Sequence, residues 1–145
     1  MRKFKFAALM VSSILIVAAC VRPDSTEAEA KIEEFHNHYN AEQFEQIYAA
    51  ASPQFRNNVE ADEMFDFLKS MRGEIGEWKY SEIENNMAVT GMSPEPTIVL
   101  TLRSQFEQDS ATEIFKYVRE DDEYFLREYT VRLNIEADEF FDPED

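Results

Sequence analysis

Residues 97–106 read TIVLTLRSQF, and this run predicts a β-strand because β-branched and other strand-forming residues fill most of its positions. The polar segment 107–110 follows as a turn, and a second strand-forming run occupies 111–119. The acidic pair Asp121-Asp122 then predicts another tight turn before a last run at 123–134. Short turns between such runs indicate β-hairpins, so this half of the chain predicts three successive antiparallel strands.

An earlier strand is predicted at Trp78-Lys79-Tyr80-Ser81, where apolar and polar residues alternate. The stretch 85–95 is ambiguous between strand and loop. Apolar side chains occupy both faces of the last three strands, and they are Ile98, Val99, Leu100, Phe115, Tyr117, Val118, Phe125 and Leu126. One face is expected to cover the helices, and the other is a candidate dimer interface.

Three helices are predicted before the strands, each with apolar residues at helical spacing. Their stripes are Ala28, Ile32, Phe35 and Tyr39; Phe44, Ile47, Tyr48 and Ala51; and Met64, Phe65, Leu68 and Met71. Ser52-Pro53 is expected to end the second helix, Phe55 to lie in a connecting turn, and Gly73 and Gly76 to close the third helix. The fold class predicted is α+β, with three N-terminal helices packed on a four-stranded antiparallel meander.

The chain begins with a secretory leader that ends at its only cysteine. Three of the first five residues are basic, and the mainly apolar run 7–19 is too short to span a membrane, which takes about 20 residues. Ala18-Ala19-Cys20 resembles the lipobox of bacterial lipoproteins. This resemblance implies a diacylglyceryl thioether at Cys20, removal of the signal peptide 1–19, and acylation of the new amino group by fatty acids such as palmitate. An ordinary secretory signal with a chance cysteine is the alternative.

The remaining chain is expected to form one domain between two short polar segments. A tether at 20–26 precedes a domain at 27–135, and an acidic tail follows at 136–145. With Cys20 acylated no cysteine is left for a disulfide, so stability must come from packing of the many aromatic residues.

The charge of the chain excludes some partners. The full sequence carries 14 basic and 30 acidic residues, and loss of the three basic residues of the leader leaves eleven, which brings the net charge from −16 to −19. Such a chain has no basic surface for nucleic acid and is repelled by anionic lipid. The anchor at Cys20 is therefore expected to hold the protein at the membrane, and a basic envelope protein is a candidate partner.

Several segments resemble the cystatin-like, nuclear transport factor 2-like superfamily, and more narrowly its small bacterial lipoproteins of unknown function. They are 35–40 (FHNHYN), 47–56 (IYAAASPQFR), 115–119 (FKYVR) followed by 124–126 (YFL) and Tyr129, and the helix that ends before Gly76. The resemblance covers about 27–133. It implies a conical space between helices and sheet that could hold a carboxylate, tyrosine or histidine.

Candidates for that space are Tyr39, Tyr48, Glu113 and Tyr129, and Trp78 with Tyr80 could line a groove. The structural alternatives are core tyrosines that hydrogen-bond their tips, a packed Trp78, and a cross-strand pair of Glu113 with an arginine such as Arg103 or Arg127.

No catalytic, metal or cofactor site is predicted. His36 and His38, the only histidines, lie two residues apart and point to nearly opposite sides of a helix, whereas a metal pair needs a spacing of three or four. We expect them to face solvent, one of them at the core edge. The acidic runs lack the spaced ligands and turn glycine of a calcium loop.

The expected function is a non-enzymatic, lipid-anchored cell-envelope protein that binds an envelope protein or a small ligand, or serves as a scaffold. Val21 after Cys20 favours outer-membrane attachment facing the periplasm over inner-membrane retention, if the source is Gram-negative. The alternatives are a pocket enzyme or small-molecule carrier of the nuclear transport factor 2-like type, and an inhibitor-like module that presents the loop 88–96.

Overall fold

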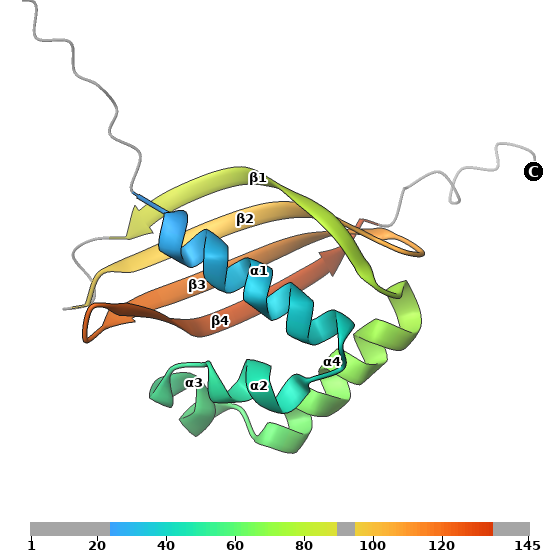
Figure 1. Cartoon of the computed structure of the whole chain (residues 1–145), viewed down its shortest axis with the longest axis horizontal. Coiled ribbons are helices and arrows are strands. Elements are labelled where there is room, and N and C mark those ends of the chain that lie inside the picture. The colour runs from blue at the N-terminus through green and yellow to red at the C-terminus, as the bar shows by residue number, and fades with distance from the viewer. Residues whose placement is uncertain (1–23, 90–94, 135–145) are drawn as a thin grey trace, which may run out of the picture.

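The computed structural model describes residues 24–89 and 95–134, which form helices followed by an antiparallel sheet (Figure 1). The order of elements confirms the α+β class. The leader with Cys20, most of the predicted tether, the acidic tail and most of the loop 88–96 lie outside the described residues. Within the described ranges, no helix is both long and apolar enough to cross a membrane.

Four helices precede the sheet, so the prediction of three is wrong. They are α1 (Thr26–Asn40), α2 (Phe44–Ala49), α3 (Pro53–Asn58) and α4 (Ala61–Ile75). The prediction that Ser52-Pro53 ends the second helix is wrong, because α2 already ends at Ala49 and Ala51 forms a bridge with Leu126 of β4. Ser52-Pro53 instead starts α3: the Ser52 Oγ accepts a hydrogen bond from the Phe55 backbone N–H at 3.2 Å, and Pro53 takes the first helical position. A serine cap followed by proline is a helix start signal. Phe55 is therefore a buried helical residue, not part of a turn.

Only one of the two glycines predicted to close the last helix does so. Gly73 lies inside α4, while Gly76 is the C-cap with φ 79°, a conformation that glycine adopts most easily. A methyl group at Gly76 would also lie 2.7 Å from Glu107 Cβ, so both the backbone conformation and the available space favour glycine at this position.

The sheet is a four-stranded meander in the order β1-β2-β3-β4, as predicted. Its strands are β1 (Trp78–Val89), β2 (Thr97–Phe106), β3 (Ser110–Glu120) and β4 (Glu123–Leu133). β1 is longer than the predicted four residues because it continues through the ambiguous stretch. Its register shifts near Trp78 and again between Ile83 and Asn85, which interrupts the alternation that a sequence pattern needs. Asp121 and Asp122 both have positive φ, as in a tight hairpin turn.

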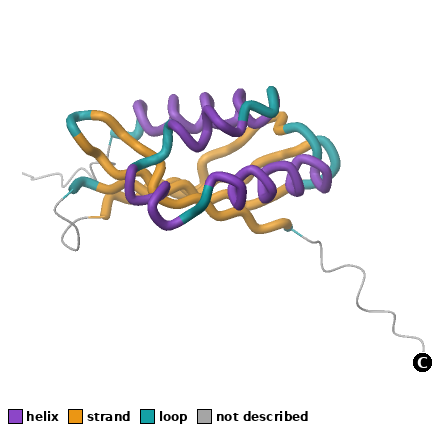
Figure 2. Tube along the Cα trace, turned by 90° about the horizontal axis from the view of Figure 1, so that it is seen from below, coloured by secondary structure: helices purple, strands orange, loops and turns teal. Residues whose placement is uncertain are grey.

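The helices pack on one face of the sheet. In Figure 2, seen from the side of α2–α4, α1 runs above the strands. The core lies between them, and its largest fully buried apolar side chains are Tyr39, Phe106, Phe115, Leu68, Ile75, Ile98 and Leu100.

The other face of the sheet is mixed in character. Val99 and Ile114 are half-buried there, but Lys116 pairs with Glu128 at 3.5 Å and Arg103 pairs with Glu84. Of the apolar residues predicted for the two faces, Ile98, Leu100, Phe115, Tyr117 and Leu126 belong to the core. Whether the remaining face forms a dimer stays a prediction.

Candidate functional site

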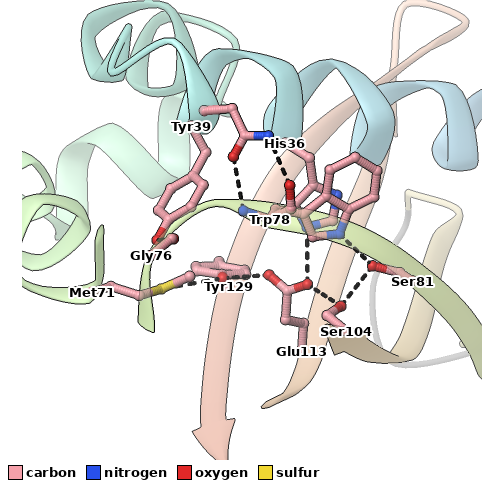
Figure 3. A network of polar contacts seen from close by, with 10 residues as sticks. His36, Tyr39, Met71, Gly76, Trp78, Ser81, Ser104, Glu113 and Tyr129 are labelled. Atoms are coloured by element: carbon pink, nitrogen blue, oxygen red, sulfur yellow. Dashed lines mark hydrogen bonds and ion pairs between the residues drawn. The ribbon is translucent and has the colours of Figure 1, made fainter. Parts of the chain in front are cut away.

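A carboxylate lies at the centre of the core, between the helices and the sheet (Figure 3). Glu113 occupies an inward position of β3 and is 0 % exposed. Its Oε1 accepts a hydrogen bond from the Tyr129 hydroxyl at 2.6 Å. Its Oε2 lies 2.9 Å from His36 Nε2 and also accepts from the Ser104 hydroxyl. Three donors from α1, β2 and β4 thus converge on one acid from β3.

A chain of hydroxyls extends this cluster to the edge of the sheet. The Trp78 indole N–H donates to Ser81 Oγ at 2.7 Å, and Ser81 Oγ lies 2.7 Å from Ser104 Oγ. An indole N–H can only donate, so the Ser81 proton is free for Ser104, and the Ser104 proton is free for Glu113. Every hydrogen bond of the chain is oriented toward the carboxylate, which fits an ionised Glu113.

His36 is held by two contacts of different kinds. Its ring stacks on Trp78 with centroids 4.4 Å apart and planes 3° from parallel, and its Nε2 faces Glu113. The side chain is buried at 1 % exposure, yet Nδ1 has no hydrogen-bond partner among the described residues. A buried polar atom without a partner is uncommon and costs free energy. Because Nδ1 is itself buried, solvent does not reach it either.

The electrostatics of the cluster favour the charged acid. Burial raises the pKa of the Glu113 carboxyl, but electrostatic attraction to His36 and the hydrogen bonds from His36, Ser104 and Tyr129 outweigh burial, so the pKa lies below its ordinary value. Burial, the Glu113 charge and the hydrogen bond to it raise the pKa of Tyr129 well above that of a free phenol. Tyr129 thus remains a neutral donor.

The predicted pocket residues do not all meet. Trp78, Glu113 and Tyr129 belong to one network, joined by His36 and two serines. Tyr39 lies in the core and donates to the Gly76 carbonyl at 3.0 Å. Burial, partly offset by Arg72, raises the pKa of Tyr39.

Tyr48 lies apart from the network. Its hydroxyl is 2.9 Å from the Val59 carbonyl, where it links α2 to the segment after α3. Tyr80 is 57 % exposed and does not line a groove with Trp78.

Two expectations about polar residues are wrong. Glu113 does not pair across the strands with an arginine: Arg103 pairs with Glu84, and Arg127 pairs with Glu95. An inward position on β3 sends the Glu113 side chain to the core, where its partners are two hydroxyl groups and His36.

His36 is fully buried rather than exposed or at the core edge, and His38 is half-buried with its Nδ1 2.8 Å from Gln43 Oε1. His36 lies four residues after Ile32 and three before Tyr39, so the apolar stripe of α1 already contained it, and this spacing is the signal that sequence reasoning missed. Ser104, also missed, occupies an inward β2 position between Leu102 and Phe106.

The network reaches a hollow in the surface at either end. A hollow of about 200 Å³ lies between α1, β1 and β2 and is lined by Glu29, Ile32, Glu33, His36, Trp78, Ser81, Ile83 and Leu102. A second of about 220 Å³ lies beside α3 and α4 and is lined by Phe55, Val59, Glu63, Met64, Phe67 and Tyr129. Neither includes Glu113, because the carboxylate is enclosed between them. Among residues 24–89 and 95–134 no three His, Cys, Asp or Glu side chains cluster as metal ligands would.

Comparison with known proteins relates the chain to one family. Residues 32–129 match the DUF4019 family, described as a protein of unknown function, and this span runs from α1 to Tyr129 of the buried network. No curated protein matches the sequence. The matched span covers well over half of the chain, and the chain therefore belongs to the DUF4019 family.

Proposed function

We propose that this protein is a lipid-anchored cell-envelope protein whose domain binds a partner or ligand without catalysing a reaction. The anchor is Cys20, on the strength of the leader and of the small residues before the cysteine. Helix α1 begins at Thr26, six residues later, and six residues reach at most about 20 Å. The N-terminal end of α1 would therefore stay close to the membrane surface.

The observation that supports a non-enzymatic role is that both oxygens of the Glu113 carboxylate are already hydrogen-bonded within the protein. A general base must reach the proton that it abstracts. Glu113 is enclosed, and both its oxygens already accept hydrogen bonds from groups of the protein itself. Its lowered pKa makes it a weaker base still. This arrangement supports a stabilising role for the network, in which helix α1 is joined to all four strands.

The charges at the anchor end of the domain support attachment by lipid alone. The β3–β4 turn beside the start of α1 carries Asp121 and Asp122, and Tyr124 N–H donates to Glu27 Oε1 at 3.0 Å to hold the two elements together. Such an acidic end is repelled by anionic headgroups. The same charge suits a basic envelope protein as partner, or a second copy joined through the outer sheet face. We assign the domain to the cystatin-like, nuclear transport factor 2-like superfamily on the sequence resemblance and the order of its elements.

The anchor is tested by expressing the full chain in a Gram-negative bacterium, with mass spectrometry of the mature protein and fractionation of the two membranes. We expect a mature N-terminus at Cys20 that carries acyl chains and sediments with the outer membrane. Cys20→Ser should release the protein, and adding Thr26→Cys to that variant should not restore attachment, because Pro23-Asp24-Ser25 precedes the new cysteine in place of the apolar and small residues Val17-Ala18-Ala19. An unmodified thiol, or a Cys20→Ser variant that still sediments with membranes, would refute the anchor.

A small-molecule carrier is the second candidate. It is favoured by the hollow of about 200 Å³ beside Trp78, which has Ile32, Ile83 and Leu102 among its lining residues. A structural role for the network and a ligand in this hollow are compatible, because Glu113 does not line the hollow.

A further inference from the structure

Strand β4 forms one edge of the sheet, and part of that edge is free (Figure 1). The link between α2 and α3 covers the first part, where the Ser52 N–H donates to the Leu126 carbonyl at 2.8 Å. From Glu128 to Leu133 the strand pairs with β3 on one side. On its other side, no backbone group within residues 24–89 and 95–134 bonds to it. Such an edge exposes N–H and C=O groups that accept a further strand, so proteins usually cover it.

An apolar groove lies beside this free edge, between β4 and α4. A hollow of about 100 Å³ there is lined mostly by apolar residues of the two elements, among them Phe67, Met71, Ile75, Val131 and Leu133. Phe67 also lines the hollow of about 220 Å³ beside Tyr129, so the two hollows are neighbours. The Phe67 side chain is nevertheless 38 % exposed.

The side chains of β4 that face α4 are incompletely covered along this groove. Val131 and Leu133 are half-buried, whereas their partners on β3, Glu113 and Ala111, are fully buried. The difference arises because β3 has a strand on both sides and this part of β4 has one on a single side. A fifth strand beside β4 would supply the missing neighbour.

The chain itself supplies a segment at the right place. β4 ends at Leu133, which lines the groove, and the next residue, Asn134, donates from its N–H to the Ser110 carbonyl at 3.1 Å. Residues 135–145 follow and contain two adjacent large apolar side chains, Phe140-Phe141. A four-residue loop at 134–137 is a common hairpin length, and it would place residue 138 opposite Leu133.

This register puts Phe140 at the groove. Residues that lie opposite each other on antiparallel strands point to the same face of the sheet. Phe140 lies opposite Val131, which lines the hollow between β4 and α4, so its ring faces the same hollow. The glutamates at the groove, Glu63 and Glu74, are exposed, and solvent and salt therefore screen their repulsion of the acidic segment.

The same register pairs opposite charges on the outer face, where Glu139 lies opposite Arg132. Arg103, Lys116 and Arg127 each pair with a glutamate, whereas Arg132 is exposed and has no acidic partner among the described residues. The added strand therefore satisfies a cation as well as the backbone edge and the groove.

We propose that residues 138–142 add to the free edge of β4 as a fifth antiparallel strand, with Phe140 in the groove between α4 and β4. The Phe140 ring covers Val131 and Phe67, and Glu139 pairs with Arg132. The strand closes the edge at which the sheet would otherwise pair with another chain. This inference goes beyond the binding role proposed above and does not depend on the lipid at Cys20.

Hydrogen exchange followed by mass spectrometry tests the added strand directly. The full chain in detergent is compared with Phe140→Ser, and a chain that ends at Pro143 is the control, because it loses two acids and keeps the strand. We expect peptides that contain residues 138–142 to exchange roughly tenfold or more slowly in the wild type than in Phe140→Ser, with unchanged protection in the control. Exchange of this segment in the wild type at the rate of an unstructured peptide would overturn the proposal.

Charge reversal tests the register by a second route. Arg132→Glu and Glu139→Arg should each weaken protection of residues 138–142 by about two- to threefold, and the double variant should recover it, because the pair is restored with its charges exchanged. A double variant no better protected than either single variant would overturn the pairing of Glu139 with Arg132.

A second copy of the chain is the other candidate for the free edge, and light scattering separates the two. We expect a wild type whose β4 edge is closed by its own strand, and a chain ending at Asn134 that self-associates more strongly because its edge is open. A wild-type dimer that persists unchanged after removal of residues 135–145, with β4 equally protected from exchange, would show that another copy covers the edge and would overturn the proposal.

Discussion

Replacing Glu113 by glutamine should destabilise the domain and remove part of its dependence on pH. The glutamine oxygen can still accept from His36 and Ser104, but its amide group faces the Tyr129 hydroxyl, 2.6 Å from Glu113 Oε1 in the wild type. Tyr129 can adapt by turning its proton toward Met71 Sδ, 3.7 Å away, and accepting from the amide. The substitution thus keeps hydrogen bonds at this position but removes the negative charge that strengthens three of them in the wild type.

The expected cost follows from those bonds. A hydrogen bond to a charged group contributes about 1.5–3 kcal/mol, against about 1 kcal/mol for a neutral one. Since the glutamine side chain would keep neutral bonds, we expect Glu113→Gln to lower the free energy of unfolding at pH 7 by about 2–3 kcal/mol. Removal of one whole partner from a buried pair costs about 3–5 kcal/mol, which sets the upper bound.

The pH dependence has a definite sign. The pKa of Glu113 is lower in the folded protein than in the unfolded chain, so its carboxylate contributes stability fully above the ordinary pKa of 4.5. That contribution is lost as the pH falls through the folded-state pKa. The difference between wild type and Glu113→Gln should therefore be constant from pH 7 to about 5 and shrink below about 4.5.

Urea unfolding of the two proteins, followed by circular dichroism between pH 7 and pH 3, measures both quantities. Glu128→Gln is the matched control, because Glu128 lies on the exposed side of β4 and pairs with Lys116 at 3.5 Å. It should cost less than about 1 kcal/mol. A loss below about 1 kcal/mol for Glu113→Gln at pH 7, or a difference that persists unchanged at pH 3, would refute the argument.

Three further predictions concern the fold and the assembly. Gly76→Ala should destabilise by about 2–3 kcal/mol because of its positive φ and the contact with Glu107, whereas Gly73→Ala, in open space within α4, should stabilise by about 0.5–1 kcal/mol; chemical denaturation of both gives opposite signs if the account is right. Ser52→Ala should cost about 1 kcal/mol by removing the cap of α3, and Ser52→Asn should recover most of it; an unchanged urea midpoint in the alanine variant would mean that the cap contributes nothing. Light scattering of a Cys20→Ser variant should show a dimer if the outer sheet face pairs, and a strict monomer at high concentration would remove that interface from consideration.

Local patterns in the sequence predicted much of this fold. The strand at 97–106 has the bounds that its β-branched residues suggested, and the turn at Asp121-Asp122 follows from acidic residues that tolerate positive φ. The apolar stripe of α1 predicted its buried face. These features depend on neighbours within a few positions, so a single sequence is enough to read them.

Other features of the helices and strands could not be predicted from local sequence patterns. α3 is a short helix whose cap Ser52 lies only three residues after the end of α2, so a local pattern does not separate its start signal from the end of the preceding helix. In β1 the register shifts change the alternation within the strand, and a template with a fixed period then fails.

The sequence by itself determined the class of the fold, the strand order that short hairpin turns impose, and the acidic character of the domain. The tertiary structure alone decided what the polar residues do. Glu113 and His36 are 77 positions apart, and nothing in the neighbours of either residue indicates that they meet. Burial is the physical reason. A buried acid on an inward strand position needs hydrogen-bond donors from the elements that surround it in the core. Only the folded chain brings α1, β2 and β4 close to Glu113.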